Sequence, residues 1–333
     1  MRTPNDWMQG NQTDAQVFVS DYESSESEMD RLVRLSLADK VRTIVQSDTL
    51  SAAPIAGLNL SYLESSKQLK NCFYHLSVAL ILKGHKRLLM GAKEYRYGPG
   101  SCIVTSMDMP TSYELVNVSK DEPFVSLSLK LNTAILAELL SDETANGAGA
   151  GVFSVAPSSR EMTEDFSRLL SLLERPEQIP IRAPLIIRDI HYLALTSPNG
   201  DCLRALYAPS ASEKRIRKAV HWLRENFRSD VSIDALAEIA SMAPTTFHRH
   251  FQEFTGFTPL QYQKRMRLYE AQQLIMNGET DAGSAAYAVG YQSVSQFSRE
   301  YKRLFGEPPG RHVKGKLLAM DEQTQREKNV TIN

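Results

Sequence analysis

The sequence is poor in the features that mark secreted, membrane-bound or metal-binding proteins. It has three cysteines, Cys72, Cys102 and Cys202, which are too far apart to indicate a disulfide framework or a zinc knuckle. Its longest apolar stretch, Leu76–Leu82, is far shorter than the roughly 20 residues of a membrane span. The polar N-terminus lacks the apolar segment of a secretory signal, so we expect a cytoplasmic protein without membrane contacts.

Motifs of common enzyme classes are also missing. The chain has no Gly-rich phosphate loop, no Gly-x-Ser-x-Gly nucleophile elbow and no Cys-x-x-Cys pair. In the first two thirds of the chain His75, His85 and His191 lie far apart, so they do not form the close histidine pair of a metal site. His248 and His250 lie on a predicted helix, where their side chains point about 200° apart. We expect no enzymatic activity, no metal and no other cofactor.

The 333 residues suffice for two domains, and charge is divided unevenly between them. The whole chain carries −1, whereas residues 214–313 hold 14 Lys and Arg against 10 Asp and Glu. This basic block is suited to a polyanionic partner. Small and polar residues at 207–213 are typical of a linker, so we predict one domain at 31–206 and a second at 214–313. A flexible tail is expected at 314–333.

The first domain begins with helical spacing and continues with strands. Residues 1–30 are expected to form a disordered acidic tail, because residues 20–30 contain five acids, four serines and no basic residue. Between Ile55 and Leu131 apolar and polar residues alternate, and turn residues divide the region into six to eight short strands. This pattern predicts an antiparallel barrel or sandwich. Helices are expected at 31–46, 132–140, 160–174 and 183–195, with a flexible connection at 146–151.

Two features of this domain leave alternatives open. The helix at 183–195 is apolar almost all round, which fits either a packed core helix or a dimer seam. The mouth of the barrel could also hold a small molecule. Each candidate wall residue could instead be an ordinary core or surface residue, and the candidates are Tyr95, Tyr97, Tyr113, His75 and Cys102. Cys102 could act as a redox or electrophile sensor only with a cationic neighbour that lowers its pKa.

The second domain contains an internal repeat. The segment Ala243–Pro259 corresponds to Ser293–Pro309 at a constant offset of 50 residues. Six pairs of similar residues define the register: Phe247 and Phe297, Arg249 and Arg299, Phe251 and Tyr301, Phe254 and Leu304, Gly256 and Gly306, Pro259 and Pro309. Within each copy the apolar residues recur at i, i+4 and i+7, so each copy is predicted to be a helix with one buried face and one polar face.

Each predicted amphipathic helix follows a shorter helix and a tight turn. The shorter helices are expected at Ile233–Ala240 and Ala282–Val289. This arrangement is typical of a helix-turn-helix, whose second helix enters the DNA major groove. A helix of some 20 residues, beginning at Pro259 and ending near Asn277, connects the copies and would be about 30 Å long. The alternative is a pair of similar helical hairpins that pack for structural reasons alone.

These residues resemble the AraC/XylS family of bacterial transcription regulators over Ile216–His312. The connector is similar through Pro259, Tyr262, Arg267, Leu268, Ala271 and Leu274, and the second unit through Val289–Lys302, Gly306, Pro308 and Pro309. The resemblance implies a double helix-turn-helix domain that binds asymmetric DNA sites upstream of a promoter and usually recruits RNA polymerase. We expect ten residues to contact DNA: Thr245, Thr246, His248, Arg249, Gln252, Ser293, Ser295, Gln296, Arg299 and Lys302.

Residues from Leu58 to about Asp142 resemble the effector half of one AraC subgroup through Gly84, Lys86, Gly91, Tyr97, Gly100 and Val104–Pro110. This resemblance implies a cupin-like barrel that accepts a small molecule and a helical part that dimerises. The predicted fold class is α+β, with a β-barrel, flanking helices and an all-α C-terminal domain. We predict a small-molecule-responsive, homodimeric activator; the alternatives are an effector-independent DNA-binding dimer and a cupin-type enzyme with a regulatory helical domain.

Overall fold

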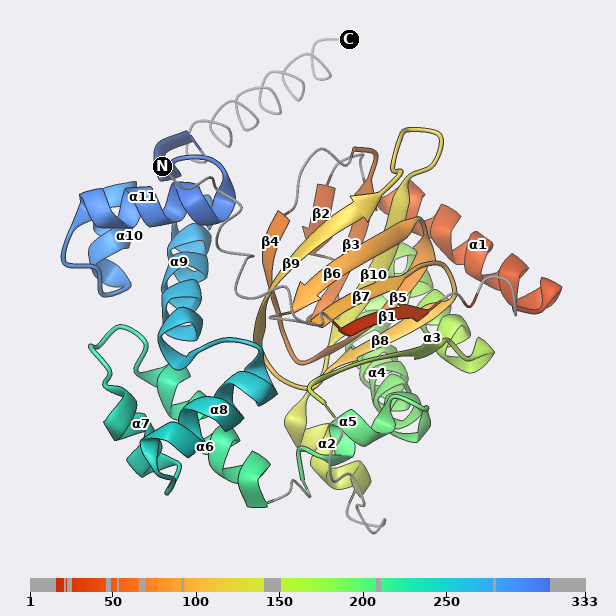
Figure 1. Ribbon diagram of the computed structural model, residues 1–333. Coiled ribbons are helices and arrows are strands. Elements are labelled where there is room, and N and C mark those ends of the chain that lie inside the picture. Colours follow the sequence, from red (N-terminus) through yellow and green to blue (C-terminus); the bar gives the residue numbers. More distant parts are fainter. Residues whose placement is uncertain are drawn as a thin grey trace. The chain divides into compact units, whose positions relative to one another are not determined.

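The computed structural model describes residues 16–20, 22, 26–45, 49–52, 54–65, 70–90, 93–140, 151–207, 211–277 and 280–311. The chain divides into an N-terminal and a C-terminal compact unit, and the division along the chain falls between Lys214 and Arg215 (Figure 1). Among the described residues, no helix combines the length and the apolarity needed to cross a bilayer.

Two β-sheets form the core of the N-terminal unit. Sheet A consists, in spatial order, of β1 (Gln16–Ser20), β7 (Lys93–Tyr97), β6 (His85–Met90), β9 (Met109–Val116) and β4 (Lys70–Tyr74). Sheet B consists of β11 (Phe153–Pro157), β8 (Ser101–Thr105), β5 (Ser77–Lys83), β10 (Phe124–Lys130), β3 (Leu58–Leu63) and β2 (Thr49–Ala52). All neighbouring strands are antiparallel except the pair β1 and β7. The predicted antiparallel fold is confirmed, and the eight strands β3 to β10 between Ile55 and Leu131 agree with the six to eight predicted there.

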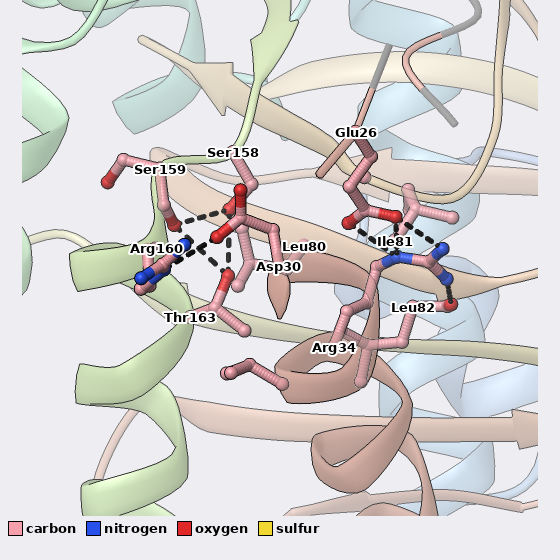
Figure 2. A pocket seen from close by; sticks show the side chains of 12 residues that line it. Glu26, Asp30, Arg34, Leu80, Ile81, Leu82, Ser158, Ser159, Arg160 and Thr163 are labelled. Carbon is pink, nitrogen blue, oxygen red and sulfur yellow. Dashed lines mark hydrogen bonds and ion pairs between the residues drawn. The ribbon is translucent and has the colours of Figure 1, made fainter. Parts of the chain in front are cut away.

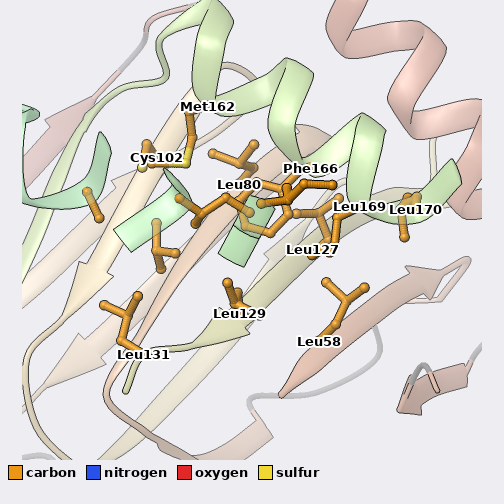
Figure 3. Packing of buried hydrophobic residues seen from close by; sticks show 14 of the residues in the cluster. Leu58, Leu80, Cys102, Leu127, Leu129, Leu131, Met162, Phe166, Leu169 and Leu170 are labelled. Atoms are coloured by element: carbon orange, nitrogen blue, oxygen red, sulfur yellow. The ribbon is translucent and has the colours of Figure 1, made fainter. Parts of the chain in front are cut away.

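Helices cover one face of sheet B. They are α1 (Glu28–Ile44), α2 (Thr133–Leu140), α3 (Arg160–Ser171), α4 (Ile179–Thr196) and α5 (Gly200–Arg204), with short 3-10 turns η2 (Leu172–Glu174) and η3 (Pro176–Gln178). Alternate residues of the strands, such as Leu80 and Leu127, pack against Phe166 and Leu169 of α3 (Figure 3). Each fully buried side chain of this size contributes about 1.5–3 kcal/mol. This leucine-rich layer holds the helices to the sheet and leaves the other face of sheet B toward sheet A.

The prediction of a disordered acidic tail at residues 1–30 is wrong for its later part. Strand β1 pairs in register with β7, and α1 begins at Glu28, capped by the Ser27 hydroxyl. Glu26 forms an ion pair of 2.7 Å with Arg34, and Asp30 forms one of 2.6 Å with Arg160. Composition suggested disorder because residues 20–30 contain acids and no basic residue. The partner of Asp30, Arg160, is distant in sequence and could not be recognised from composition. Residues 1–15 of this predicted tail, the whole tail predicted at 314–333 and most of the connection predicted at 146–151 lie outside the described residues.

The C-terminal unit is helical, as predicted. Its helices are α6 (Ala211–Glu225), α7 (Ile233–Ile239), α8 (Pro244–Thr255), α9 (Pro259–Asn277), α10 (Ala282–Ala288) and α11 (Val294–Phe305). Residues 211–213, which we assigned to the linker, already belong to α6, because small and polar residues are also compatible with a first helical turn. In Figure 1 α9 runs between two helix pairs, with α7 and α8 at one of its ends and α10 and α11 at the other.

Candidate nucleic-acid interface

The predicted repeat is present in three dimensions. The ring centroids of Phe247 and Phe251 in α8 lie 5.4 Å apart at an interplanar angle of 58°. The rings of Phe297 and Tyr301 in α11 repeat both values. These four side chains are fully buried, so each helix is fixed by the same aromatic pair on its inner face. Both copies therefore turn the same polar face outward.

The repeat contains one additional residue in its second turn. Helices α8 and α11 are offset by 50 residues, whereas α7 (Ile233–Ile239) and α10 (Ala282–Ala288) are offset by 49. Ser241 and Gly290 open the two turns in the left-handed region, at φ +50° and +90°. The second turn is therefore one residue longer than the first. The sequence pattern showed only the offset of 50 because its matching residues all lie from Ala243 onward.

Eight of the ten predicted contact residues are exposed on these outer faces: Thr245, Thr246, Arg249, Gln252, Ser295, Gln296, Arg299 and Lys302. His248 and Ser293 are half-buried. The Ser293 hydroxyl accepts a 3.3 Å hydrogen bond from the Gln296 backbone N–H and so caps α11, a structural role that the sequence analysis did not assign. Its hydroxyl proton still allows it to donate to an external acceptor.

The two arginines are available for binding on these faces. Neither Arg249 nor Arg299 has a hydrogen-bond or ion-pair partner among the residues that the structure describes. Gln296, in contrast, donates to Glu300 Oε1 at 3.2 Å, and Glu300 also accepts from Lys264 and Tyr291. A free guanidinium can bind a guanine edge bidentately or a phosphate.

Helix α9 connects the repeats and is built as a stiff spacer. Thr258 and Gln261 form a reciprocal capping box at its start, with bonds of 3.1 and 3.3 Å. Tyr262, in its first turn, packs edge-on against Phe251, and Tyr269, near its middle, packs edge-on against Phe305. Its 19 residues give a length of about 28 Å. This length is close to the roughly 34 Å between successive major-groove faces on one side of a duplex.

A second candidate site lies between the two sheets of the N-terminal unit. The Lys86 ammonium of β6 is 3.9 Å from the ring centroid of Tyr113 and 5.2 Å from that of Tyr74. The Tyr74 and Tyr97 hydroxyls are 3.3 Å apart, and Tyr74, Tyr95 and Tyr97 all contact the ring of Phe153 on sheet B. Burial raises the pKa values of Tyr74, Tyr97 and Tyr113 above their usual range, so these hydroxyls remain protonated.

Of the five predicted wall residues, the structure brings three together here, Tyr95, Tyr97 and Tyr113. His75 instead lies exposed beside a turn, 3.2 Å from Asp108. Cys102 faces the helices and belongs to the leucine-rich core (Figure 3). Its carbonyl accepts from Asn199, and burial raises the pKa of its thiol to about 12. A thiol with this pKa is protonated at neutral pH, which argues against a redox-sensor role for Cys102.

Sequence reasoning missed Lys86 and Tyr74 as members of this cluster. The available signal was period-two alternation, which puts Lys86, Leu88 and Met90 on one face of β6. The facing surface of sheet B carries small or polar residues that are all half-buried: Asn59, Ser61, Ala79, Ser126 and Ser128. We call the two facing surfaces, with Tyr74, Lys86, Tyr95, Tyr97, Tyr113 and Phe153, the inter-sheet site.

A separate pocket lies where α1, β5 and the start of α3 meet (Figure 2). Its charged side chains pair with one another, Glu26 with Arg34 and Asp30 with Arg160. Hydrogen bonds from Ser27 and Arg160 lower the pKa of the Asp30 carboxyl. Because its charges are already paired, this pocket serves as a structural junction. No group of three or more metal-ligating side chains occurs within the described ranges.

Helix α4 has two different faces. Ile186, Ile190 and Ala194 are buried in the core, which confirms core packing for part of the helix. Ile181, Leu185 and Tyr192 are exposed by 73%, 67% and 51% of their surface. The alternative prediction for this helix, a dimer contact, therefore applies only to this exposed outer stripe.

Two helix-turn-helix repeats with matching exposed arginines, attached to an antiparallel β-sheet domain, define a DNA-binding transcription regulator. A family profile described as "AraC-type transcriptional regulator N-terminus" matches residues 54–202, and one described as "Helix-turn-helix domain" matches residues 236–315. The chain belongs to the AraC family of transcriptional regulators, and its relatives are regulators and not enzymes.

Individual relatives agree with this assignment. The XylDLEGF operon transcriptional activator of Pseudomonas putida is 23% identical over 251 residues, which are 73% of this chain and 75% of that protein. The transcriptional activator RhaS of Escherichia coli strain SE11 is 34% identical over 98 residues, 29% of this chain and 35% of that protein. The crystal structure of ToxT from Vibrio cholerae O395 has the same fold, with a TM-score of 0.54 at 15% identity over 77% of this chain and 96% of that chain.

Proposed function

We propose that the chain activates transcription by recognising two neighbouring DNA half-sites with α8 and α11, under the control of a small molecule bound in the N-terminal unit. The observation that carries the proposal is the equivalence of the two helices, each with a buried aromatic pair behind an exposed, unpaired arginine. A protein of this kind acts on DNA in the cytoplasm and recruits RNA polymerase to the promoter.

The ten interface residues fall into three chemical groups. Arg249 and Arg299 are proposed to bind guanine, and Gln252 and Gln296 are suited to adenine. The remaining residues, Thr245, Thr246, His248, Ser293, Ser295 and Lys302, can bond to phosphates or to base edges. Phosphate contacts by lysine and arginine would provide most of the affinity, while base contacts would provide the sequence preference.

Selection from a random DNA pool with the full chain tests DNA recognition. We expect an enriched asymmetric sequence with two conserved elements about 10 base pairs apart. Arg249→Ala should relax one element and Arg299→Ala the other. A pool that stays random after several rounds would contradict the proposal.

For the effector we propose a small carboxylic acid with an apolar or aromatic body, bound at the inter-sheet site. Lys86 would pair with the carboxylate, the Tyr97 and Tyr113 hydroxyls would donate to it, and the aromatic rings would cover its apolar part. Similar folds of ToxT have been solved with an unsaturated fatty acid and with (E)-4-(8-methylnaphthalen-1-yl)but-3-enoic acid, at 14% identity and a TM-score of 0.55 in both cases. Both ligands are carboxylic acids.

Thermal shift with a panel of aromatic and fatty acids, each beside its amide, tests this part. A ligand at 100 times its dissociation constant should stabilise the folded chain by about 2.7 kcal/mol. Lys86→Met should abolish the shift, whereas Lys120→Met, which removes an exposed lysine from a turn, should keep it. Equal shifts from acid and amide, or a shift that survives Lys86→Met, would contradict the assigned role of Lys86.

We also propose that the outer stripe of α4, made of Ile181, Leu185 and Tyr192, is the homodimer contact. Exposed apolar side chains at helical spacing form the kind of surface that a second copy covers. Leu185→Asp should convert the dimer to a monomer in light scattering, and Arg182→Ala on the same helix should not. A chain that is monomeric before mutation would contradict this assignment.

A further inference from the structure

One arginine of the connector helix joins both repeats. Arg267 Nε donates to the Phe227 carbonyl at 2.6 Å, and its Nη2 donates to those of Arg228 and Ser229 at 3.2 and 2.8 Å. Its Nη1 donates to the Gly290 carbonyl at 3.2 Å. Four of the five N–H groups of a guanidinium are thus used. They connect the loop between α6 and α7, which leads into the first repeat, to the turn between α10 and α11, inside the second.

The same loop and turn also touch directly. Arg228 Nε donates to the Ala288 carbonyl at 3.0 Å. Gly290 lies so close to the loop that a Cβ atom there would be 2.0 Å from the Arg228 carbonyl oxygen. This contact needs both the small size of glycine and its left-handed backbone, at φ +90°. The loop that leads into the first repeat is therefore in contact with the turn of the second through backbone atoms, and not only through flexible side chains.

The chemistry of Arg267 suits this position. Phe227, Arg228 and Ser229 lie in the loop after α6, and their carbonyl oxygens accept hydrogen bonds from the planar guanidinium. Asp230, 3.8 Å from the guanidinium, adds a full negative charge. The Arg267 side chain is only 14% exposed, so its charge depends on these partners. A lysine ammonium is a point charge without the planar fork and cannot bridge the same set of carbonyls.

We propose that Arg267 is a positioning residue that fixes the distance and rotation between the two recognition helices, so that the protein accepts one spacing between its DNA half-sites. The inference depends on the proposed recognition of DNA by α8 and α11. One inserted base pair moves a half-site by about 3.4 Å and rotates it by about 35°. A rigid pair of repeats cannot follow this displacement, whereas a pair without the Arg267 link can.

Binding of the full chain to spacer variants of its selected DNA site tests the proposal. One base pair is added to or removed from the segment between the half-sites. We expect the Kd of the unaltered protein to rise more than about tenfold and that of Arg267→Met less than about threefold. Binding to the unaltered spacer should change less, because Arg267 is not among the interface residues. A wild-type spacer profile in Arg267→Met would overturn the proposal.

Gln263→Leu is the matched control. Gln263 donates to the same Phe227 and Ser229 carbonyls, at 3.0 and 2.7 Å, but has no bond to the second repeat among the described residues. It should lower the melting temperature and retain the strict spacer profile. If Gln263→Leu broadens the profile as much as Arg267→Met, general loosening explains the effect and the specific role of Arg267 is wrong.

A measurement without DNA separates this inference from the proposed function. Spin labels on noncanonical ketone residues at Glu238 and Glu307, both exposed, report the distance between the repeats in the full chain. The distribution should be narrow for the unaltered protein and for Gln263→Leu, and broad for Arg267→Met or, should that variant fail to fold, Arg267→Lys. A narrow distribution in the Arg267 variants overturns the proposal even if selection finds no DNA site.

Discussion

Arg249 and Arg299 occupy the same position on α8 and α11, each two residues after a fully buried phenylalanine and two residues before a fully buried aromatic ring. The ring pairs behind them have the same spacing and angle. Because α8 and α11 are fixed in the same way, the two guanidiniums leave their helices in the same direction relative to the local core. The two repeats therefore share the direction of this arginine side chain as well as their helix-turn-helix fold.

Replacing either arginine tests whether that cation contacts a base. Arg249→Ala and Arg299→Ala should each cost about 1–3 kcal/mol of DNA binding at one base pair. Arg249→Lys and Arg299→Lys should lose most of the same discrimination, because lysine keeps the charge but not the bidentate geometry. Titrations on single-base variants measure this. Full retention of discrimination by the lysine variants would show contact with phosphate instead.

Lys302 provides a contrasting case near the end of α11, where it is exposed. If it contacts a phosphate, Lys302→Ala should weaken binding to all sequences by a similar factor and reduce the slope of log K against log salt by about 1. Anisotropy titrations at several salt concentrations give the slope. An unchanged slope would remove Lys302 from the interface.

Gly290→Ala should destabilise the C-terminal unit by at least about 2 kcal/mol, because the new Cβ meets a backbone carbonyl and the backbone is left-handed. Ser241 occupies the equivalent left-handed position of the first repeat. Ser241→Gly should therefore be neutral or stabilise by up to about 1 kcal/mol. Urea denaturation followed by circular dichroism compares the two, and equal effects would contradict the close contact at Gly290.

Asp165 predicts a pH effect in the N-terminal unit. Burial, together with the nearby Asp189 carboxylate, raises the pKa of Asp165 from 3.8 to about 6. Between these values the folded chain holds a proton that the unfolded chain releases, so this group lowers stability as pH rises through the window. Asp165→Asn should raise the melting temperature at about pH 7.5 and leave it nearly unchanged at about pH 3.5. A constant difference at both pH values would contradict the shifted pKa.

Much of this architecture could be predicted from local patterns. Alternation marked the strands, and the aromatic and arginine register between 243 and 309 predicted the two recognition helices and their exposed faces. Partners distant in sequence could not be predicted. The acidic segment around Glu26 looked like a solvated tail because Arg160, which binds Asp30, lies 130 residues away.

The N-terminal site shows the same limit. Tyr95, Tyr97 and Tyr113 of sheet A could be proposed as wall residues from sequence. Cys102 lies in sheet B, on the face that packs against the helices. Which face meets the helices depends on the packing of sheet B. Arg267 likewise looked like part of a family pattern, and only the fold brings it to the carbonyls of Phe227 and Gly290.

We propose that α8 and α11 recognise two half-sites through equivalent arginines. The most direct test maps, for Arg249→Ala and Arg299→Ala separately, the base pair at which sequence discrimination is lost on one selected DNA site. We predict two different positions about 10 base pairs apart, one for each variant. Loss at the same position for both variants, or uniform weakening at every position, would contradict the claim.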